Sequence, residues 1–303
     1  MVLTVVLNPC VDKTLWVEKL TLDLATRAGR MDLQSGGKGT NVARVLSRLG
    51  TPCRCLALTG GIQGQWYTAL AREEGIDLIP VPVSGQTRCI TTMVEEGTFR
   101  QAAFAEPGAK VSEAEWRAFF EAFDAQLPET DWVVLQGSLP APELGWVYRE
   151  LIERAHASGS RVWLDSRDEG LTQCVEAGPD FIKPNEQELS QLLSSRTATG
   201  PEQLLGTVPN IVLSRGEQGA SWLSSQGELR QCVFPVEAVN PVGSGDSFTA
   251  GFLHGLSRGY TREDTLKLAC LLGALNASQW RAADFTRADV EGALKRYGLT
   301  LAL

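Results

Sequence analysis

Short apolar runs alternate with longer stretches of helical periodicity through the second half of the chain. The apolar runs occupy residues 132–135, 161–165, 180–183 and 210–214. The stretches of helical character occupy 142–157, 171–177, 186–193, 246–256, 262–280 and 287–297. Strands that alternate with helices form βαβ units, in which a mostly parallel sheet carries helices on both faces. The pattern therefore predicts an α/β fold.

The first third of the chain follows a different pattern. Residues 2–7 are typical of a β-branched first strand, and apolar positions spaced i, i+3, i+4, i+7 over 42–49 predict an amphipathic helix. Residues 11–34 lack a helical period, and residues 87–105 alternate in polarity around a hairpin turn at 95–97. We expect these two segments to form a small sheet outside the main one.

The remaining segments complete this picture. Residues 220–223 and 230–234 are predicted to pair as a hairpin across 225–227, and the polar segment 194–201 is expected to be an exposed loop. The chain shows neither an internal repeat nor a low-complexity linker. We therefore expect residues 1–303 to form a single α/β domain, to which about 11–34 and 87–105 contribute the strands of a lid.

Composition narrows the possible functions. The chain has 303 residues, of which 43% are hydrophobic and 21% charged, and this balance is typical of globular proteins. Its apolar runs, such as 269–275, are far shorter than the roughly 20 residues of a membrane-spanning helix. The net charge of −8 disfavours nucleic-acid binding, which depends on clustered Lys and Arg. Residues 1–7 do not resemble a signal peptide, so we expect a cytoplasmic protein.

The cysteines and histidines do not suggest a metal site. The seven cysteines are scattered without a Cys-x-x-Cys motif, and the chain has only two histidines. Zinc sites need closely spaced Cys and His ligands, so this distribution disfavours one. We expect the cysteines, including Cys10 and Cys89, to pack as small hydrophobic side chains.

Glycine is concentrated in two loops that each lead into a predicted helix. The first loop spans residues 35–41 and the second spans 240–246. A helix N-terminus offers unpaired N–H groups and the positive end of the helix dipole, and glycine lets an anion approach the backbone closely. Each loop alone could be a tight turn, with Asp246 as an N-cap. Lys38 is not part of a P-loop, because Asp32 stands where that motif requires its first glycine.

Two such loops in one chain suggest two anions held near each other with a carboxylate between them. This geometry suits phosphoryl transfer, in which positioning and charge stabilisation do most of the work. The backbone N–H groups of Gly243, Ser244 and Gly245 would face the transferred phosphoryl group. Asp246 would accept the proton of the attacking hydroxyl. Lys38 and Arg88 would hold an anionic group on the substrate.

These residues lie in segments that resemble the signatures of the ribokinase-like, PfkB-type carbohydrate kinases. Residues 36–41 are similar to the N-terminal signature of that family and residues 240–247 to its C-terminal signature. Further similar segments, in the family's order, are 8–12, 136–140, 183–188 and 213–219. The match extends over nearly the whole chain, and within the family it is strongest with the sugar-phosphate kinases of the tagatose-6-phosphate kinase and 1-phosphofructokinase type.

The resemblance implies a ribokinase-like fold, a mostly parallel central sheet flanked by helices with a small β-sheet lid. It implies that Asp246 is the catalytic base and that residues 243–245 form the anion hole. It places on the sugar side Asp12, Gly37, Lys38, Asn41, Arg88 and Ser138. It places on the nucleotide side Lys183, Asn185, Ser214, Gly216, Gly219 and Asn276. Glu188 would hold Mg²⁺ indirectly through water. Asp165 is either structural or part of the nucleotide side, and Arg215 departs from the apolar residue usual in the family.

The activity implied is ATP-dependent phosphorylation of a ketohexose monophosphate, with tagatose 6-phosphate as the first substrate to test. A 1-phosphofructokinase or 6-phosphofructokinase activity is the alternative. A non-catalytic sugar-phosphate-binding protein of the same fold is a more remote one, since fold alone does not establish function. The implied cofactors are ATP as phosphoryl donor and Mg²⁺. The lid suggests a homodimer, with neither a nucleic-acid nor a membrane partner.

Overall fold

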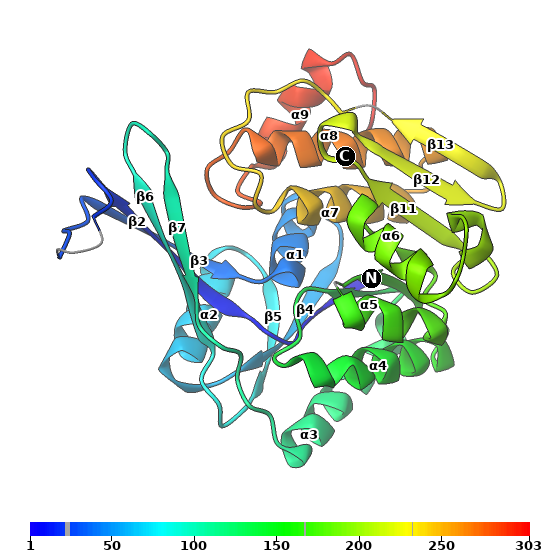
Figure 1. Cartoon of the computed structure of the whole chain (residues 1–303), viewed down its shortest axis with the longest axis horizontal. Coiled ribbons are helices and arrows are strands. Elements are labelled where there is room, and N and C mark those ends of the chain that lie inside the picture. The colour runs from blue at the N-terminus through cyan, green and yellow to red at the C-terminus, as the bar shows by residue number, and fades with distance from the viewer. Residues whose placement is uncertain (22–24, 167, 232) are drawn as a thin grey trace.

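A computed structural model of the chain describes residues 1–21, 25–166, 168–231 and 233–303. Figure 1 shows a large sheet between two layers of helices and a small sheet that stands apart on one side. Residues 22–24 of the predicted lid segment and residue 232 of the predicted hairpin lie outside the described residues. Within those residues, no helix is both long enough and apolar enough to cross a membrane.

The large sheet has nine strands in the order β13-β12-β11-β10-β9-β8-β1-β4-β5. In chain order they are β1 (Val2–Val6), β4 (Cys53–Thr59), β5 (Asp77–Pro82), β8 (Trp132–Gln136), β9 (Arg161–Asp165), β10 (Phe181–Ile182), β11 (Asn210–Ser214), β12 (Ala220–Ser224) and β13 (Gly227–Gln231). The strands from β5 to β11 run parallel, and β12 and β13 run antiparallel at one edge. The predicted mostly parallel sheet is therefore confirmed.

Helices cover both faces of this sheet. They are α1 (Lys38–Arg48), α2 (Gly61–Glu73), α3 (Glu113–Asp124), α4 (Gly145–Ala157), α5 (Asp168–Cys174), α6 (Glu186–Ser195), α7 (Ser244–Ser257), α8 (Arg262–Ala277) and α9 (Arg287–Arg296). Successive residues of β8 alternate between the two hydrophobic cores. Trp132 and Val134 pack with α1, α7, α8 and α9, whereas Val133 and Leu135 pack with α3 to α6. This alternation explains the continuous apolar runs in the sequence, because strands covered on both faces need no polar positions.

The small sheet is the predicted lid. Its four strands are β2 (Cys10–Val17), β3 (Arg30–Gly36), β6 (Arg88–Glu95) and β7 (Gln101–Ala105), in the order β3-β2-β6-β7. β2 and β3 come from the predicted segment 11–34, and β6 and β7 from the predicted segment 87–105. One face of this sheet is turned toward the loops at the carboxyl ends of the main strands.

Several element boundaries differ from the sequence prediction. The second strand of the hairpin is 227–231 rather than 230–234, and the helix expected over 262–280 ends at residue 277. The helical stretch expected from residue 142 begins as a 3₁₀ turn and becomes α4 at residue 145. β5 was not predicted, because Pro80 and Pro82 interrupt its strand pattern. Proline is tolerated there since β5 is an edge strand.

Candidate active site

Most of the predicted site residues line one cavity. It has a volume of about 1040 Å³ and lies between the lid, the carboxyl ends of the parallel strands and the first turns of α1 and α7. Its lining includes the predicted residues Asp12, Gly37, Lys38, Asn41, Arg88, Ser138, Lys183, Asn185, Glu188, Ser214, Gly243, Gly245 and Asp246. Ligands in open α/β sheets bind beyond the carboxyl ends of the strands, and this cavity has that position.

The start of α7 depends on a glycine in a left-handed conformation. Gly243 has φ of 87°, and a Cβ atom there would lie 2.8 Å from the Cβ atom of Ala282. The turn therefore requires glycine for both its conformation and its packing. Gly243 and Gly245 line the cavity. The N–H of Ser244 already donates to the Pro241 carbonyl oxygen, so any anion at this helix start would rely on the neighbouring N–H groups.

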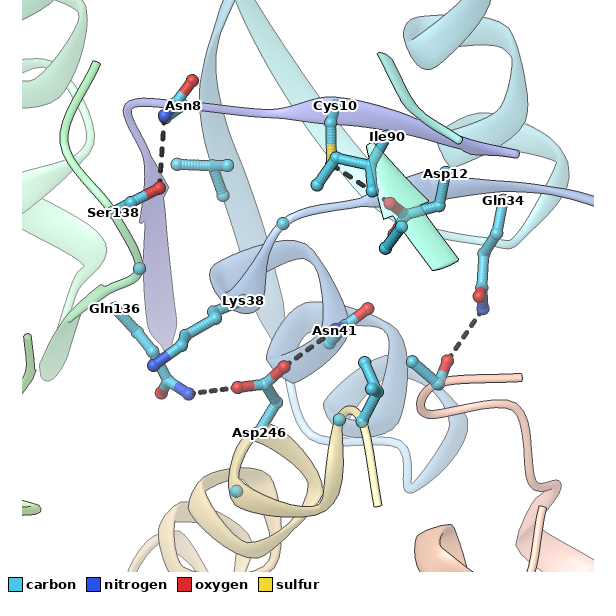
Figure 2. Close-up of a pocket in the computed structure, with 18 of the residues that line it drawn as sticks. Asn8, Cys10, Asp12, Gln34, Lys38, Asn41, Ile90, Gln136, Ser138 and Asp246 are labelled. Carbon is cyan, nitrogen blue, oxygen red and sulfur yellow. Dashed lines mark hydrogen bonds between the residues drawn. The ribbon is translucent and has the colours of Figure 1, made fainter. Parts of the chain in front are cut away.

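Asp246 is buried in the first turn of α7 and accepts a hydrogen bond on each carboxylate oxygen (Figure 2). Asn41 Nδ2 donates to Oδ2 at 2.7 Å, and Gln136 Nε2 donates to Oδ1 at 2.6 Å. Burial raises the pKa of the Asp246 carboxyl above its ordinary value, although the Lys38 ammonium and the Asn41 amide act in the opposite direction. The carboxylate is therefore oriented from two sides in a site with little solvent.

Two lysines meet at a single buried carboxylate. Lys183 Nζ lies 2.9 Å from Asp165 Oδ2, and Lys38 Nζ lies 3.5 Å from Asp165 Oδ1. Burial alone would raise the pKa of Asp165, but the two ammonium groups hold that pKa below its usual range. Burial likewise opposes the charge on Lys183, and Asp165 raises the pKa of that lysine above its ordinary value. Lys183 therefore stays charged beside the cavity.

The lid side of the cavity carries a third carboxylate, that of Asp12. Asp12 lies in β2 against Gly36, where a Cβ atom would collide with the carboxylate. Burial raises the pKa of Asp12 to about 6, an effect only partly offset by the thiol of Cys10 and by Arg44. Cys10 Sγ donates to Asp12 Oδ1 at 3.4 Å, as Figure 2 shows. Cys10 thus packs in the cavity wall, and its pKa is raised by burial.

A polar cluster forms near the end of β1. Arg88 Nη2 lies 3.3 Å from the Asn8 carbonyl oxygen and 3.5 Å from Ser138 Oγ. Asn8 Nδ2 in turn donates to Ser138 Oγ at 3.2 Å (Figure 2). The structure therefore brings together the predicted pair Arg88 and Ser138, which come from the lid and from the loop after β8.

The residues predicted for the nucleotide side fall into two groups. Asn185 and Glu188 form a reciprocal capping box at the start of α6 on the cavity wall, with backbone-to-side-chain bonds of 2.9 and 2.8 Å. Of the described residues, Gly216, Gly219 and Asn276 are predicted for the nucleotide side but do not line the cavity, and neither does Ser244 of the predicted anion hole. Arg215 lies beside Glu186, at 3.4 Å, and donates to Ser221 Oγ at 2.8 Å.

Asn276 has a clear structural setting, and its predicted place near an adenine stays a prediction. It is completely buried in α8. Its Nδ2 donates to the Val242 carbonyl oxygen at 2.9 Å and to Ser244 Oγ at 3.0 Å, and its Oδ1 accepts from Ala283 N at 2.6 Å. Asn276 therefore ties the loop before α7 to the segment after α8.

Sequence reasoning assigned no role to Gln136 or Arg44, and it left Asp165 undecided. Gln136 and Asp165 end the adjacent strands β8 and β9 and pair in register. Polar residues that end buried parallel strands are the signal that could have marked both for the site. Arg44 lies within a helix of mixed polarity, and nothing in its local sequence marks it.

The helix layers, the strand order and the lid define a ribokinase-like carbohydrate kinase fold. The chain belongs to the pfkB family of carbohydrate kinases, whose family model matches residues 5–287. The expected family membership and fold class are thereby confirmed, and so is the expectation of a kinase.

Individual relatives align over almost the whole chain. The chain is 32% identical to the tagatose-6-phosphate kinase of Staphylococcus epidermidis over 289 residues, which cover 92% of this chain and 93% of the relative. It is 30% identical to the 1-phosphofructokinase of Bacillus subtilis over 284 residues, which cover 91% and 92% of the two chains.

Solved structures share the fold at lower identity. The potassium complex of phosphofructokinase-2 from Escherichia coli superposes with a TM-score of 0.86 at 24% identity, covering 98% of this chain and 99% of that chain. The ribokinase of Thermotoga maritima superposes with a TM-score of 0.79 at 22% identity, covering 97% and 99%.

Proposed function

We propose that the protein transfers the γ-phosphoryl group of ATP to a hydroxyl of a ketohexose monophosphate, with tagatose 6-phosphate as the first substrate. The observation that carries the proposal is the buried carboxylate of Asp246 at the start of α7, in a cavity that also holds Lys38 and Lys183. The two aligned relatives named for sugar-phosphate substrates support the substrate class. Fructose 1-phosphate and fructose 6-phosphate are the alternatives.

In this mechanism Asp246 takes the proton of the attacking hydroxyl. The hydroxyl oxygen forms a bond to the γ-phosphorus while the bond from that phosphorus to the bridging oxygen breaks, and ADP leaves. The charge that develops on the phosphoryl oxygens faces the glycine turn at the start of α7, where the backbone and the helix dipole stabilise it. Lys183 lies at the same place, since its Nζ is 3.6 Å from the position of a Cβ on Gly245.

The phosphate already on the sugar would bind at the polar cluster of Arg88 and Ser138. A guanidinium group matches the geometry of a phosphate, and Ser138 Oγ stands beside it. Asp12, on the neighbouring lid strand β2, would accept hydrogen bonds from sugar hydroxyls. Because Arg88 comes from the lid, binding of a phosphorylated sugar would hold the lid against the main sheet.

Magnesium would accompany the nucleotide. The described residues contain no cluster of three or more His, Cys, Asp or Glu side chains that could hold a metal ion. Mg²⁺ typically keeps several waters and binds through one or two carboxylates plus substrate phosphates, so this cavity fits that habit. Glu188, on the cavity wall beside Asn185, would hold the ion through water, and the ion would neutralise charge on the phosphates.

The lid also offers a surface for a second copy of the chain. Asp12, Thr14, Ile90 and Thr92 line the cavity, and the alternation of side chains along a strand turns Leu15 and Met93 to the outer face of the lid. That outer face carries Leu15, Met31, Met93 and Phe104, on adjacent strands. Met31 is 52% exposed and Phe104 is 57% exposed. We propose that the outer faces of two lids pack against each other in a homodimer.

A substrate panel tests the proposed activity. Tagatose 6-phosphate, fructose 6-phosphate and fructose 1-phosphate are compared with free tagatose and fructose by ADP formation in saturating Mg-ATP. We expect turnover of at least one phosphorylated sugar and a much lower kcat/KM for both free sugars. The variant Arg88→Gln should raise KM for the phosphorylated sugar, whereas Arg72→Gln on the exposed surface of α2 serves as the charge-matched control. A folded protein that prefers the free sugars would contradict the proposal.

A further inference from the structure

Arg44 is a completely buried arginine in α1, one helical turn after Asn41. Its side chain is 0% exposed, and Nη2 lies 2.8 Å from Glu74 Oε2. Nε also donates to Glu74 at 3.0 Å, and Nη2 donates to Ser35 Oγ at 3.0 Å. Burying a charge is expensive unless the charge is paired and hydrogen-bonded, and Glu74 supplies that pairing. The Glu74 and Ser35 contacts leave one arm of the guanidinium, Nη1, for another task.

That arm reaches the residue that holds the proposed base. Arg44 Nη1 donates to Asn41 Oδ1 at 2.6 Å, and Asn41 Nδ2 donates to Asp246 Oδ2 at 2.7 Å. A guanidinium only donates and an ionised carboxylate only accepts, so the Asn41 amide between them has one favourable orientation. If the amide were reversed, its NH₂ would face Arg44 and its oxygen would face Asp246. Arg44 therefore determines which end of the amide meets the carboxylate.

The same arm of Arg44 also touches the segment that packs against the glycine turn. Nη1 lies 3.4 Å from the Ala282 carbonyl oxygen. The Cβ of Ala282 leaves no room for a side chain on Gly243 at the start of α7. Gln34 of the lid donates to the same carbonyl oxygen at 2.8 Å. Arg44 thus contacts Asn41, which hydrogen-bonds to the proposed base, and also Ala282, which packs against Gly243.

We propose that Arg44 is a positioning residue for phosphoryl transfer, which acts through the Asn41 amide to orient the carboxylate of Asp246. The inference rests on the proposed role of Asp246 as base. Arg44 does not line the cavity in the described part of the chain, so it would act without touching substrate. The charged groups that act electrostatically on the pKa of Asp246 are Lys38 from α1, Asp165 from β9 and Lys183 after β10, and they are unchanged in the variants below.

A double-mutant cycle on Arg44→Met and Asn41→Ala tests the proposal, with kcat, KM and the pH profile of kcat/KM measured for each variant. We expect each single variant to lower kcat about 10- to 100-fold, as for loss of a hydrogen bond to a charged group. Arg44→Met should leave KM little changed because Arg44 does not line the cavity in the described part of the chain, whereas Asn41→Ala should also raise KM for the sugar. In the Asn41→Ala background, Arg44→Met should lower kcat by less than about threefold, because residues that act in one chain of contacts are not additive.

Arg44→Lys and Arg48→Met separate positioning from stability. Lysine keeps a charge for Glu74 but lacks the fork that reaches Asn41 and Ser35 together, so Arg44→Lys should fold and still show the lowered kcat. Arg48 lies one turn further along α1 and donates to the carbonyl oxygens of Ala283 and Phe285 without reaching Asn41. Arg48→Met should therefore leave kcat within about twofold of the wild type.

The ionisation of Asp246 gives a readout that needs no turnover. The Asn41 amide favours the ionised form, so its loss of orientation should raise the pKa of Asp246 and move the acidic limb of the kcat/KM profile to higher pH. Carboxyl-carbon NMR, assigned with Asp246→Asn, should show the same rise in Arg44→Lys and no rise in Arg48→Met. Additive losses in the cycle, or wild-type kcat and pKa in Arg44→Lys, would overturn the proposal. Full activity in Asp246→Asn would instead refute the base on which it rests.

Discussion

Gln136 Nε2 donates a hydrogen bond of 2.6 Å to Asp246 Oδ1, which joins the end of β8 to the first turn of α7. The two residues are 110 positions apart in the chain. Gln136 is only 1% exposed, and it lines the cavity together with Asp246. Together with Asn41, this glutamine sets the plane of the carboxylate and favours its ionised form. The contact leads to the first prediction.

Replacing Gln136 with methionine removes the donor while keeping a side chain of similar length. We expect kcat to fall about 10-fold or more, because a hydrogen bond to a charged group is lost. The pKa of Asp246 should rise, so the acidic limb of the kcat/KM profile should move to higher pH. Gln136→Glu should move that limb further, since it adds a second carboxyl group beside the first. Unchanged profiles in both variants would argue against this role.

The second prediction concerns the proposed base itself. Asp246→Asn keeps the size of the side chain but cannot accept the proton of the hydroxyl, and we expect kcat to fall by about 10²–10⁴-fold. Sugar and nucleotide affinity, measured by calorimetry, should change by only a few fold. This variant also separates a kinase from a non-catalytic binding protein. Turnover close to that of the wild type would refute the assignment of Asp246.

The third prediction concerns Asp165, which compensates two lysines. Asp165→Asn leaves the buried ammonium of Lys183 without its partner, and we expect a loss of about 3–5 kcal/mol of unfolding free energy. The lowered pKa of Asp165 means that its contribution is present above about pH 4 and is lost as pH falls through the folded-state pKa. The difference in unfolding free energy between wild type and Asp165→Asn, measured by urea unfolding, should therefore become smaller at acidic pH. Asp284→Asn, in a half-exposed pair with Arg48, should lose at most about 1 kcal/mol.

The fourth prediction concerns Asp12, whose pKa is raised, whereas the pKa of Asp165 is lowered. Its pKa of about 6 lies above the ordinary 3.8, so the folded state holds that proton between about pH 4 and pH 6. The contribution of Asp12 to the unfolding free energy should therefore fall as pH rises through this window. Asp12→Asn should therefore raise the unfolding free energy by about 1–2 kcal/mol at pH 8, with no gain near pH 4. It should also raise KM for the sugar. Asp77→Asn at an exposed position provides the control, and a destabilised Asp12→Asn at pH 8 would contradict the argument.

The fifth prediction concerns the lid dimer. Phe104→Glu places a charge on the apolar outer face of the lid, and we expect it to convert a dimer into a monomer in sedimentation velocity at micromolar concentration. Ile62→Glu, on α2 at a position 79% exposed, should leave the dimer intact. A wild-type protein that is monomeric, or a Phe104→Glu dimer as stable as the wild type, would refute this interface.

Much of the fold could be predicted because local patterns determine it. The apolar runs of the parallel strands and the stripe of α1 depend on which face of each element is buried, and that requirement is written at regular intervals along the chain. Glycine loops before α1 and α7 could be located for the same reason, since glycine suits the positive φ at which each helix begins. β5 escaped prediction because its prolines are permitted by an edge position that no local pattern reveals.

The residues of the candidate site can also be divided into those that a local motif marks and those whose contacts depend on packing. The sequence alone marked Asp246, Lys38 and the two glycine loops as candidates, because each lies within a short motif. Only the tertiary structure decided their partners: Asn41 and Gln136 on Asp246, Lys183 and Lys38 on Asp165, and Arg44 behind Asn41. It also brought Asn276 into hydrogen-bond contact with Val242 and Ser244, on either side of Gly243. Such pairings depend on how separate elements pack against one another, and residues up to 205 positions apart meet only when the sheet and its helix layers have assembled.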